Sequence, residues 1–244
     1  MRINRFLAQA GFGSRRTCEE LIKRGKVKIN NIPVSQLATQ VNPEIDKVTV
    51  NGKEVQLPHQ KIYIMLNKPS GYIVTATDPY NRKTIFNLLP ELSVRVFSVG
   101  RLDMQSTGLL LLTNDGDFAN AIIHPRNKIP KTYIVKAKGI LTYSQLKKLR
   151  NGIMLDEEYM AKAKVIIKSY NKKQGITKLR MTIYEGKNRQ LRRMIQAVGS
   201  SVISLKRVQI GNLRLASLPE GAWRFLKNKE VAALWRKENQ SAKP

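Results

Sequence analysis

Residues 100–116, GRLDMQSTGLLLLTNDG, decide the fold class of the larger part of the chain, because an apolar run stands between two turn signals. The run GLLLLT begins at Gly108 and predicts a strand, and TNDG predicts the turn that follows it. The segment VRVFSV, which ends at Gly100, predicts another strand. Asp103 therefore lies in a loop between two strands that we expect to be central.

Strand and helix signals continue on both sides of this segment. Strands are predicted for KIYIML, GYIVTA, TYIVKA, AKVIIKS and TKLRMTIY. Helical spacing appears in GDFANAIIHP, in LTYSQLKKLRNG with Thr142 as its N-cap, and in KNRQLRRMIQAVG. Strands outnumber helices, and several are close enough in sequence to be antiparallel neighbours. We therefore predict an α+β domain with a mostly antiparallel sheet over residues 62–236, followed by a disordered tail at 237–244.

A smaller domain is predicted over residues 1–57, with a linker at 58–61. Its first helix reads INRFLAQA, and a second helix, RRTCEELIKR, starts after the N-cap Ser14 and ends at Gly25. The strand-like VKI and the Asn-Gly turn between VTV and KEV complete a helix-helix-strand unit. The expected fold is therefore α+β throughout, with a small N-terminal domain and a larger, mostly antiparallel one.

The charge balance points to a polyanion as the partner. Lys and Arg number 44 against 17 acidic residues, a formal net charge of +27. Nucleic acid is the commonest soluble polyanion, whereas solubility alone requires a net charge of only about 2–8. One cysteine and two well-separated histidines predict neither a disulfide within the chain nor a metal site. No apolar run is long enough to span a bilayer, so we expect a cytoplasmic protein without a membrane partner.

Basic residues crowd the two N-terminal helices and the turn after them. They are Arg2, Arg5, Arg15, Arg16, Lys23, Arg24, Lys26 and Lys28. A solvated helix face usually mixes charges of both signs, and only Glu19 and Glu20 do so here. Phosphate binding therefore explains the pattern better than a solvated face.

Asp103 is the strongest candidate for chemistry, because so few histidines and cysteines leave acid–base or covalent work mainly to Asp, Glu, Lys, Arg or Tyr. A loop between two strands holds a carboxylate rigidly, with Arg101 before it and Ser106 after it. The alternative is an Asp that only caps the loop or pairs with an arginine. The residues alone leave both open.

The motifs resemble a known family in several places and in family order. FLAQAGFGSRR and LIKRGKVKIN resemble the αL RNA-binding domain shared with a small-subunit ribosomal protein. GRLDMQSTGLLLLTNDG resembles the signature of the RsuA/RluB family of ribosomal RNA pseudouridine synthases. LNKPSGYIVTATD, KTYIVKAKG and EGKNRQLRRMIQAVG with VISLKRVQIG resemble the family's other motifs.

This resemblance implies the site residues and the chemistry. Asp103 matches the catalytic Asp, which either attacks the anomeric carbon of the target uridine or removes its ribose 2′ proton. Tyr133 matches the tyrosine that stacks on the flipped base, and Arg192 matches the basic residue facing the Asp, with Lys187 as second choice. The reaction needs no cofactor. Further RNA contacts are expected from Arg101, Lys187, Arg189, Arg193, Ser14 and the N-terminal basic residues.

Within the family the resemblance is greatest to the large-subunit, B-type members that act on 23S rRNA. Members that act on 16S rRNA are the first alternative. A non-catalytic rRNA-binding factor of ribosome assembly, which retained the fold, is the second. We expect a monomer with ribosomal RNA as its partner.

Overall fold

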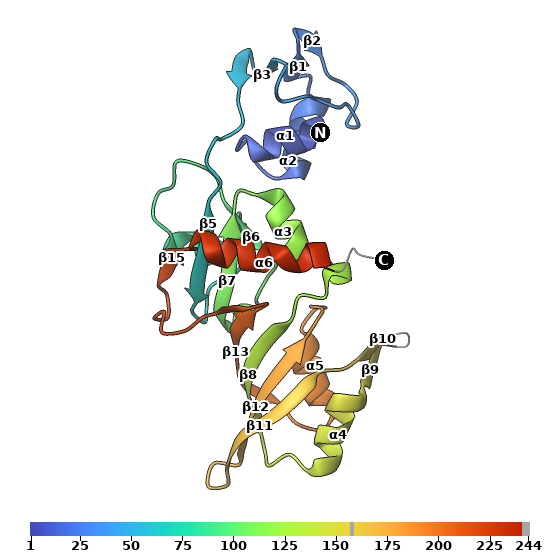
Figure 1. The fold of residues 1–244 in the computed structure, drawn as a ribbon, viewed down its shortest axis with the longest axis vertical. Coiled ribbons are helices and arrows are strands. Elements are labelled where there is room, and N and C mark those ends of the chain that lie inside the picture. Colours follow the sequence, from blue (N-terminus) through green and yellow to red (C-terminus); the bar gives the residue numbers. More distant parts are fainter. Residues whose placement is uncertain (157–158, 241–244) are drawn as a thin grey trace. The chain divides into compact units, whose positions relative to one another are not determined.

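The computed structural model describes residues 1–156 and 159–240, which divide into two compact units (Figure 1). The first unit comprises Met1–Ile62 with the short segments Leu92–Val96 and Asn114–Gly116. The rest of the described chain, from Tyr63 onward, forms the second unit. None of the described helices has the length and apolar character that crossing a membrane would require.

The first unit is a pair of helices on a four-stranded antiparallel sheet in the order β2-β1-β3-β4. Its elements are α1 (Ile3–Gln9), α2 (Arg15–Lys23), β1 (Val27–Ile29), β2 (Ile32–Pro33), β3 (Val48–Val50) and β4 (Lys53–Val55). Ser14 Oγ accepts the Thr17 backbone N–H at 3.1 Å, so the predicted N-cap of α2 is confirmed. Gly25 has a φ of +66° just after α2, and Asn51 and Gly52 take the left-handed conformation of the predicted hairpin turn.

Apolar side chains of both helices form the core of this unit with the strand residues. Ile3, Leu7 and Cys18 are fully buried, and Val27 and Val48 meet them from the sheet. Burial raises the pKa of the Cys18 thiol to about 11, which keeps it a neutral thiol that behaves as a small apolar side chain.

The second unit is built on one large sheet in the order β11-β12-β8-β13-β7-β5-β15, with β14 on β13 and β6 on β7. Every ladder is antiparallel except the pairing of β13 with β7, so the predicted α+β class with a mostly antiparallel sheet is confirmed. The strands are β5 (Tyr63–Lys68), β6 (Phe97–Val99), β7 (Thr107–Thr113), β8 (Lys131–Lys138), β11 (Lys164–Asn171), β12 (Ile176–Ile183), β13 (Val202–Ile210), β14 (Leu213–Arg214) and β15 (Trp223–Phe225). A separate hairpin pairs β9 (Ile153–Asp156) with β10 (Tyr159–Ala161).

Helices cover the two halves of this sheet. They are α3 (Gly116–Ile123), α4 (Tyr143–Asn151), α5 (Gln190–Ala197) and α6 (Asn228–Gln240), with 3-10 turns at η1 (Ile85–Leu88) and η2 (Pro125–Asn127). Phe118 of α3 and Leu234 of α6 share a core with Leu109 and Leu111 of β7. On the other half, α4 contacts β11, and α5 contacts β13 and β9.

Two expectations need correction. The segment GYIVTA is not a strand, since it forms only an isolated bridge from Ile73 to Thr84 in a long loop. The chain from residue 237 is not a tail throughout, because α6 continues to Gln240. This helix is fixed earlier along its length, where Val231, Leu234 and Trp235 pack on the apolar core. Residues 241–244 lie outside the described chain.

Candidate active site

Asp103 lies in the loop between β6 and β7, and a buried lysine holds that loop in place. Lys68 at the end of β5 is fully buried, and its Nζ donates to the carbonyl oxygens of Pro69, Met104 and Ser106 at 2.9, 3.1 and 2.9 Å. Ser106 N–H also donates to Asp103 O at 3.0 Å. Burial lowers the pKa of Lys68 to about 8, although nearby Asp103 raises it. Three carbonyl acceptors and one carboxylate compensate this buried cation.

A close approach of β7 to β13 places the loop beside the centre of the sheet. Gly108 has a φ of +101°, and a Cβ there would lie 2.2 Å from the carbonyl oxygen of Arg207. Only glycine allows the two backbones to come this close. The parallel pairing of β13 with β7 consists of Thr107 opposite Lys206 and Gly108 opposite Arg207, so the position of the Asp103 loop depends on this glycine.

Arg192 of α5 is the cation that faces Asp103. Its Nε lies 3.6 Å from Asp103 Oδ2, an ion pair longer than a hydrogen bond, and its Nη2 donates to Ser106 Oγ at 3.4 Å. Burial lowers the pKa of the Arg192 guanidinium, while Asp103 raises it. The Arg192 side chain is 12% exposed and that of Asp103 is 32% exposed. The carboxylate therefore keeps an open side that a substrate can reach.

A cavity of about 320 Å³ opens beside this pair. Asp103 and Ser106 line it together with Tyr133 of β8 and Arg207 of β13. Tyr133 and Arg207 lie directly opposite each other in the ladder and are 7% and 4% exposed. The cavity thus combines the accessible Asp103 carboxylate, a buried aromatic ring and buried cations.

Positive charge dominates the wall of the cavity. The basic side chains in it are Arg101, Lys131, Lys187, Arg189 and Arg207, against the acidic Asp103 and Glu185. Burial lowers the pKa of Lys131 to about 8, and the neighbouring Arg207 lowers it further. Arg207 Nε donates to Leu109 O at 2.7 Å, but its buried Nη2 lacks a hydrogen-bond partner among the described residues. Such a wall favours an anionic ligand.

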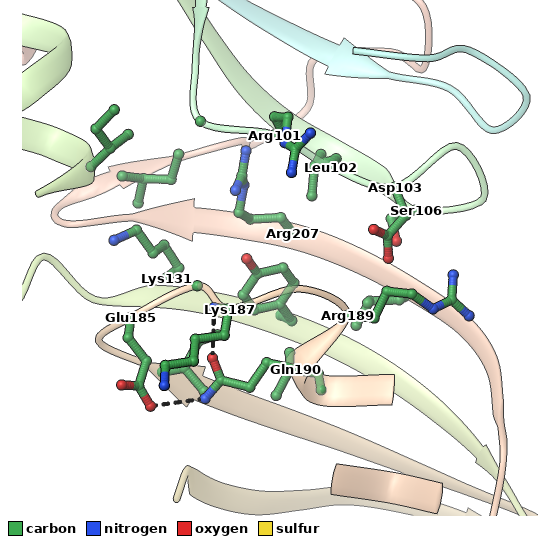
Figure 2. A pocket seen from close by; sticks show the side chains of 18 of the residues that line it. Arg101, Leu102, Asp103, Ser106, Lys131, Glu185, Lys187, Arg189, Gln190 and Arg207 are labelled. Atoms are coloured by element: carbon green, nitrogen blue, oxygen red, sulfur yellow. Dashed lines mark hydrogen bonds between the residues drawn. The ribbon is translucent and has the colours of Figure 1, made fainter. Parts of the chain in front are cut away.

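Lys187 lies apart from Asp103. Figure 2 shows Lys187 and Glu185 at the opposite end of the view from Asp103 and Ser106. Lys187 Nζ stands 3.4 Å from the centre of the Tyr159 ring, a cation–π contact. Glu185 Oε1 accepts from the Tyr159 hydroxyl and, at 3.0 Å, from Gln190 Nε2. Arg192 rather than Lys187 is therefore the residue that the structure places beside the carboxylate.

The other expected RNA contacts are divided between the two units. Arg101 and Arg189 are exposed on the rim of the cavity, and Arg189 takes a left-handed conformation just before α5. Arg193 points elsewhere, since its Nη2 donates to Leu155 O at 2.7 Å. The remaining residues belong to the first unit, where all but the half-buried Arg5 are exposed: Arg2, Arg5, Ser14, Arg15, Arg16, Lys23, Arg24 and Lys28. Lys23 is paired with Glu20 at 2.9 Å.

Sequence reasoning missed three cations of the site: Lys68, Lys131 and Arg207. Each lies in a strand, where a charged residue usually indicates the end of the strand or a solvent-exposed position. A usable signal is that each stands inside a quoted motif: Lys68 in LNKPSGYIVTATD, Lys131 in KTYIVKAKG and Arg207 in VISLKRVQIG. The described residues contain no cluster of His, Cys, Asp and Glu side chains that could hold a metal ion.

Comparison with known proteins finds matches over both units. The family model described as RNA pseudouridylate synthase matches residues 62–197, and the S4 domain model matches residues 1–44. The chain is 43% identical to ribosomal large subunit pseudouridine synthase B of Bacillus subtilis, over 96% of this chain and 95% of the relative. It is also 43% identical to an uncharacterized RNA pseudouridine synthase of Aquifex aeolicus, over 97% and 94%. A crystal structure of a pseudouridylate synthase superposes with a TM-score of 0.70 at 30% identity, covering 96% of this chain and 99% of that one.

Proposed function

Because this chain belongs to the RNA pseudouridylate synthase family and carries an S4 domain, we propose that it isomerises one uridine of 23S ribosomal RNA to pseudouridine, with Asp103 acting on the target nucleotide. The observation that carries the proposal is the accessible Asp103 carboxylate, which pairs with Arg192 and lines a basic cavity. A protein that only bound RNA would gain nothing from a carboxylate at this position, since it repels phosphates.

Pseudouridine formation breaks the bond between N1 of uracil and C1′ of ribose, turns the base, and joins C5 to C1′. The C5 proton leaves and N1 gains a proton, so no atom is added or lost overall and no redox partner is needed. Asp103 starts the reaction in one of two ways: it attacks C1′ directly, or it removes the 2′ proton to give a glycal. In either route, Arg192 is the cation beside the reacting carboxylate.

Tyr133 supplies the platform for the flipped base. Extruding a base from its stack costs a few kcal/mol, and stacking on an aromatic ring returns about 1–3 kcal/mol. The Tyr133 ring lines the cavity from the central strand β8, where it is almost fully buried and firmly held. The same tyrosine assists removal of the C5 proton.

The large-subunit target rests on similarity to the Bacillus subtilis protein, whose name specifies the large ribosomal subunit. A 16S target is the alternative, and a comparison of the two rRNAs as substrates separates them. The S4 domain grips RNA chiefly through the exposed Arg2 at the N-cap of α1 and the exposed Arg15 and Arg16 at the start of α2. Ribosomal RNA as the substrate places the activity in the cytoplasm.

Tritium release from rRNA labelled at uridine C5 tests the proposal. The native chain should release tritium from unmodified 23S rRNA and not from 16S rRNA, and Asp103→Asn should abolish the release while rRNA binding persists. Glu185→Gln is the matched control, because it removes the other carboxylate of the cavity. Equal release by native chain and Asp103→Asn would refute the role of Asp103, and release from 16S rRNA alone would refute the large-subunit target.

A further inference from the structure

The face of the large sheet that is turned away from the cavity carries a dense group of cations. Strands β8, β11, β12 and β13 contain neither Asp nor Glu. Side chains alternate between the two faces of a strand. Residues an odd number of positions from the cavity-lining Tyr133 or Arg207, and the residues opposite them in neighbouring strands, therefore point to the reverse side. The cations on this side, which we call the reverse-face cations, are Lys136, Lys138, Lys164, Lys178, Arg180 and Lys206.

The strand register brings several of these cations together. Lys136 of β8 lies directly opposite Lys178 of β12. Arg180 lies opposite Ile134, which in turn pairs with Lys206 of β13. Five of the six side chains are exposed, and Lys206 is half-buried. Within residues 1–156 and 159–240, no carboxylate forms an ion pair with any of them.

Such an arrangement is unfavourable for the free protein. Like charges directly opposite each other in neighbouring strands destabilise a sheet, whereas an exposed face normally carries charges of both signs. Helices α4 and α5 pack against the other face, where Leu179 and Met181 are fully buried. The reverse-face cations are therefore open to a partner, and a polyanion would remove their mutual repulsion.

We propose that the reverse face binds the phosphate backbone of RNA, at a segment of the ribosomal RNA other than the one that enters the cavity. The identity of this RNA rests on the proposed function; the charge complementarity does not. Tyr133 and the reverse-face cations point to opposite faces of the sheet, so a nucleotide in the cavity leaves this face free for a second segment. The face adds affinity for long RNA without entering the chemistry.

The test compares two triple variants with the same loss of charge in the full-length chain. One changes Lys136→Gln, Lys178→Gln and Arg180→Gln on the reverse face. The control changes three exposed helical lysines, Lys147→Gln, Lys148→Gln and Lys229→Gln. The dissociation constant for an unmodified 23S rRNA transcript is measured by filter binding at several KCl concentrations. Melting temperatures show that both variants are folded, and the reverse-face variant should melt no lower than the native chain.

The reverse-face variant should bind the transcript at least about tenfold more weakly, with its salt slope reduced by about two to three, while the control changes both little. Tritium release at saturating RNA should stay near the native rate. Equal weakening of both variants, or no weakening of either, would overturn the proposal. The proposal would also be overturned if the reverse-face variant bound the 23S rRNA transcript as tightly as the native chain and lost only binding to vesicles of anionic phosphatidylglycerol. Because RNA binding needs no turnover, a native chain without tritium release would refute the proposed function while this test still gave an answer.

Discussion

At the scale of single residues, a variant of Arg192, the ion-pair partner of Asp103, distinguishes an effect on the reaction rate from an effect on RNA binding. Removing the Arg192 guanidinium leaves the Asp103 carboxylate without its neighbouring positive charge. Arg192→Gln should therefore reduce the single-turnover rate of tritium release by about 100-fold or more, while the dissociation constant for rRNA changes less than about threefold.

Lys187→Gln is the control for this prediction, because the Lys187 ammonium lies against the Tyr159 ring and not beside Asp103. It should lower the rate by less than about tenfold. A larger loss in Lys187→Gln than in Arg192→Gln would mean that the basic partner of the carboxylate has been assigned to the wrong residue.

Lys131 provides a test based on pH. Burial lowers the pKa of this ammonium to about 8 in the folded protein, below the 10.5 of an ordinary lysine. The unfolded chain therefore binds more protons between these values, and the burial penalty is complete below pH 8 and fades as the pH approaches 10.5. Lys131→Met should raise the free energy of unfolding by about 2–3 kcal/mol at pH 7, and this gain should shrink steadily above pH 8.

Urea denaturation of the native and variant chains at a series of pH values measures this difference. Lys138→Met, in the same strand but exposed, should change stability little at any pH. If Lys131→Met were no more stable than the native chain at pH 7, burial of the uncompensated Lys131 ammonium would not destabilise the folded protein.

At the scale of elements, the contact of β7 with β13 depends on one glycine. An alanine Cβ at position 108 would meet the Arg207 backbone at 2.2 Å, in addition to the strain of a positive φ. Gly108→Ala should lower the free energy of unfolding by at least about 3 kcal/mol, measured by urea denaturation.

Gly139→Ala separates the two causes. Gly139 also has a positive φ of +86°, but no atom lies within 4 Å of a Cβ built there. Gly139→Ala should lower the free energy of unfolding only by the cost of backbone strain, about 1–2 kcal/mol. Equal losses in the two variants would show that the approach of the strands is unimportant.

Elements with local signals could be predicted from the sequence. Helix α4 has Thr142 and Gln145 as a reciprocal capping box, and the Asn51-Gly52 turn fixes the hairpin of β3 and β4. The segment GYIVTA could not be placed, because its alternating pattern predicts a strand although no neighbouring strand pairs with it beyond one bridge. Helix α6 was missed because its apolar residues bury only against a core formed by distant strands.

The candidate site shows the same division. Asp103, Tyr133 and Arg192 stand in recognisable motifs, although no pattern in the sequence gives their distances. The role of Lys68 could not be predicted from the sequence, because two of its three hydrogen-bond acceptors, Met104 O and Ser106 O, lie in a loop far away along the chain. Contacts between segments this far apart in sequence follow from the folded sheet alone.

At the scale of the whole molecule, the net charge of +27 supplies the several basic surfaces that we propose as RNA contacts. In the S4 domain, Arg15 and Arg16 are exposed at the start of α2 and free to bind phosphates. Arg15→Gln with Arg16→Gln should weaken binding to 23S rRNA and reduce its salt slope by about two. Filter binding over a range of KCl concentrations measures both quantities.

Lys23→Gln with Lys47→Gln removes the same charge from the same unit. The carboxylates of Glu20 and Glu54 already compensate the charges of these two lysines. This double variant should therefore weaken rRNA binding less than Arg15→Gln with Arg16→Gln does. An equal effect of the two double variants would indicate attraction by net charge rather than by a defined surface.

The most direct test of the central claim is a map of pseudouridine in ribosomal RNA from cells that lack this chain. The account predicts that one uridine of 23S rRNA is unmodified there, that purified native protein restores pseudouridine at that position, and that Asp103→Asn does not. A complete set of 23S pseudouridines in those cells, or restoration by Asp103→Asn, would contradict it.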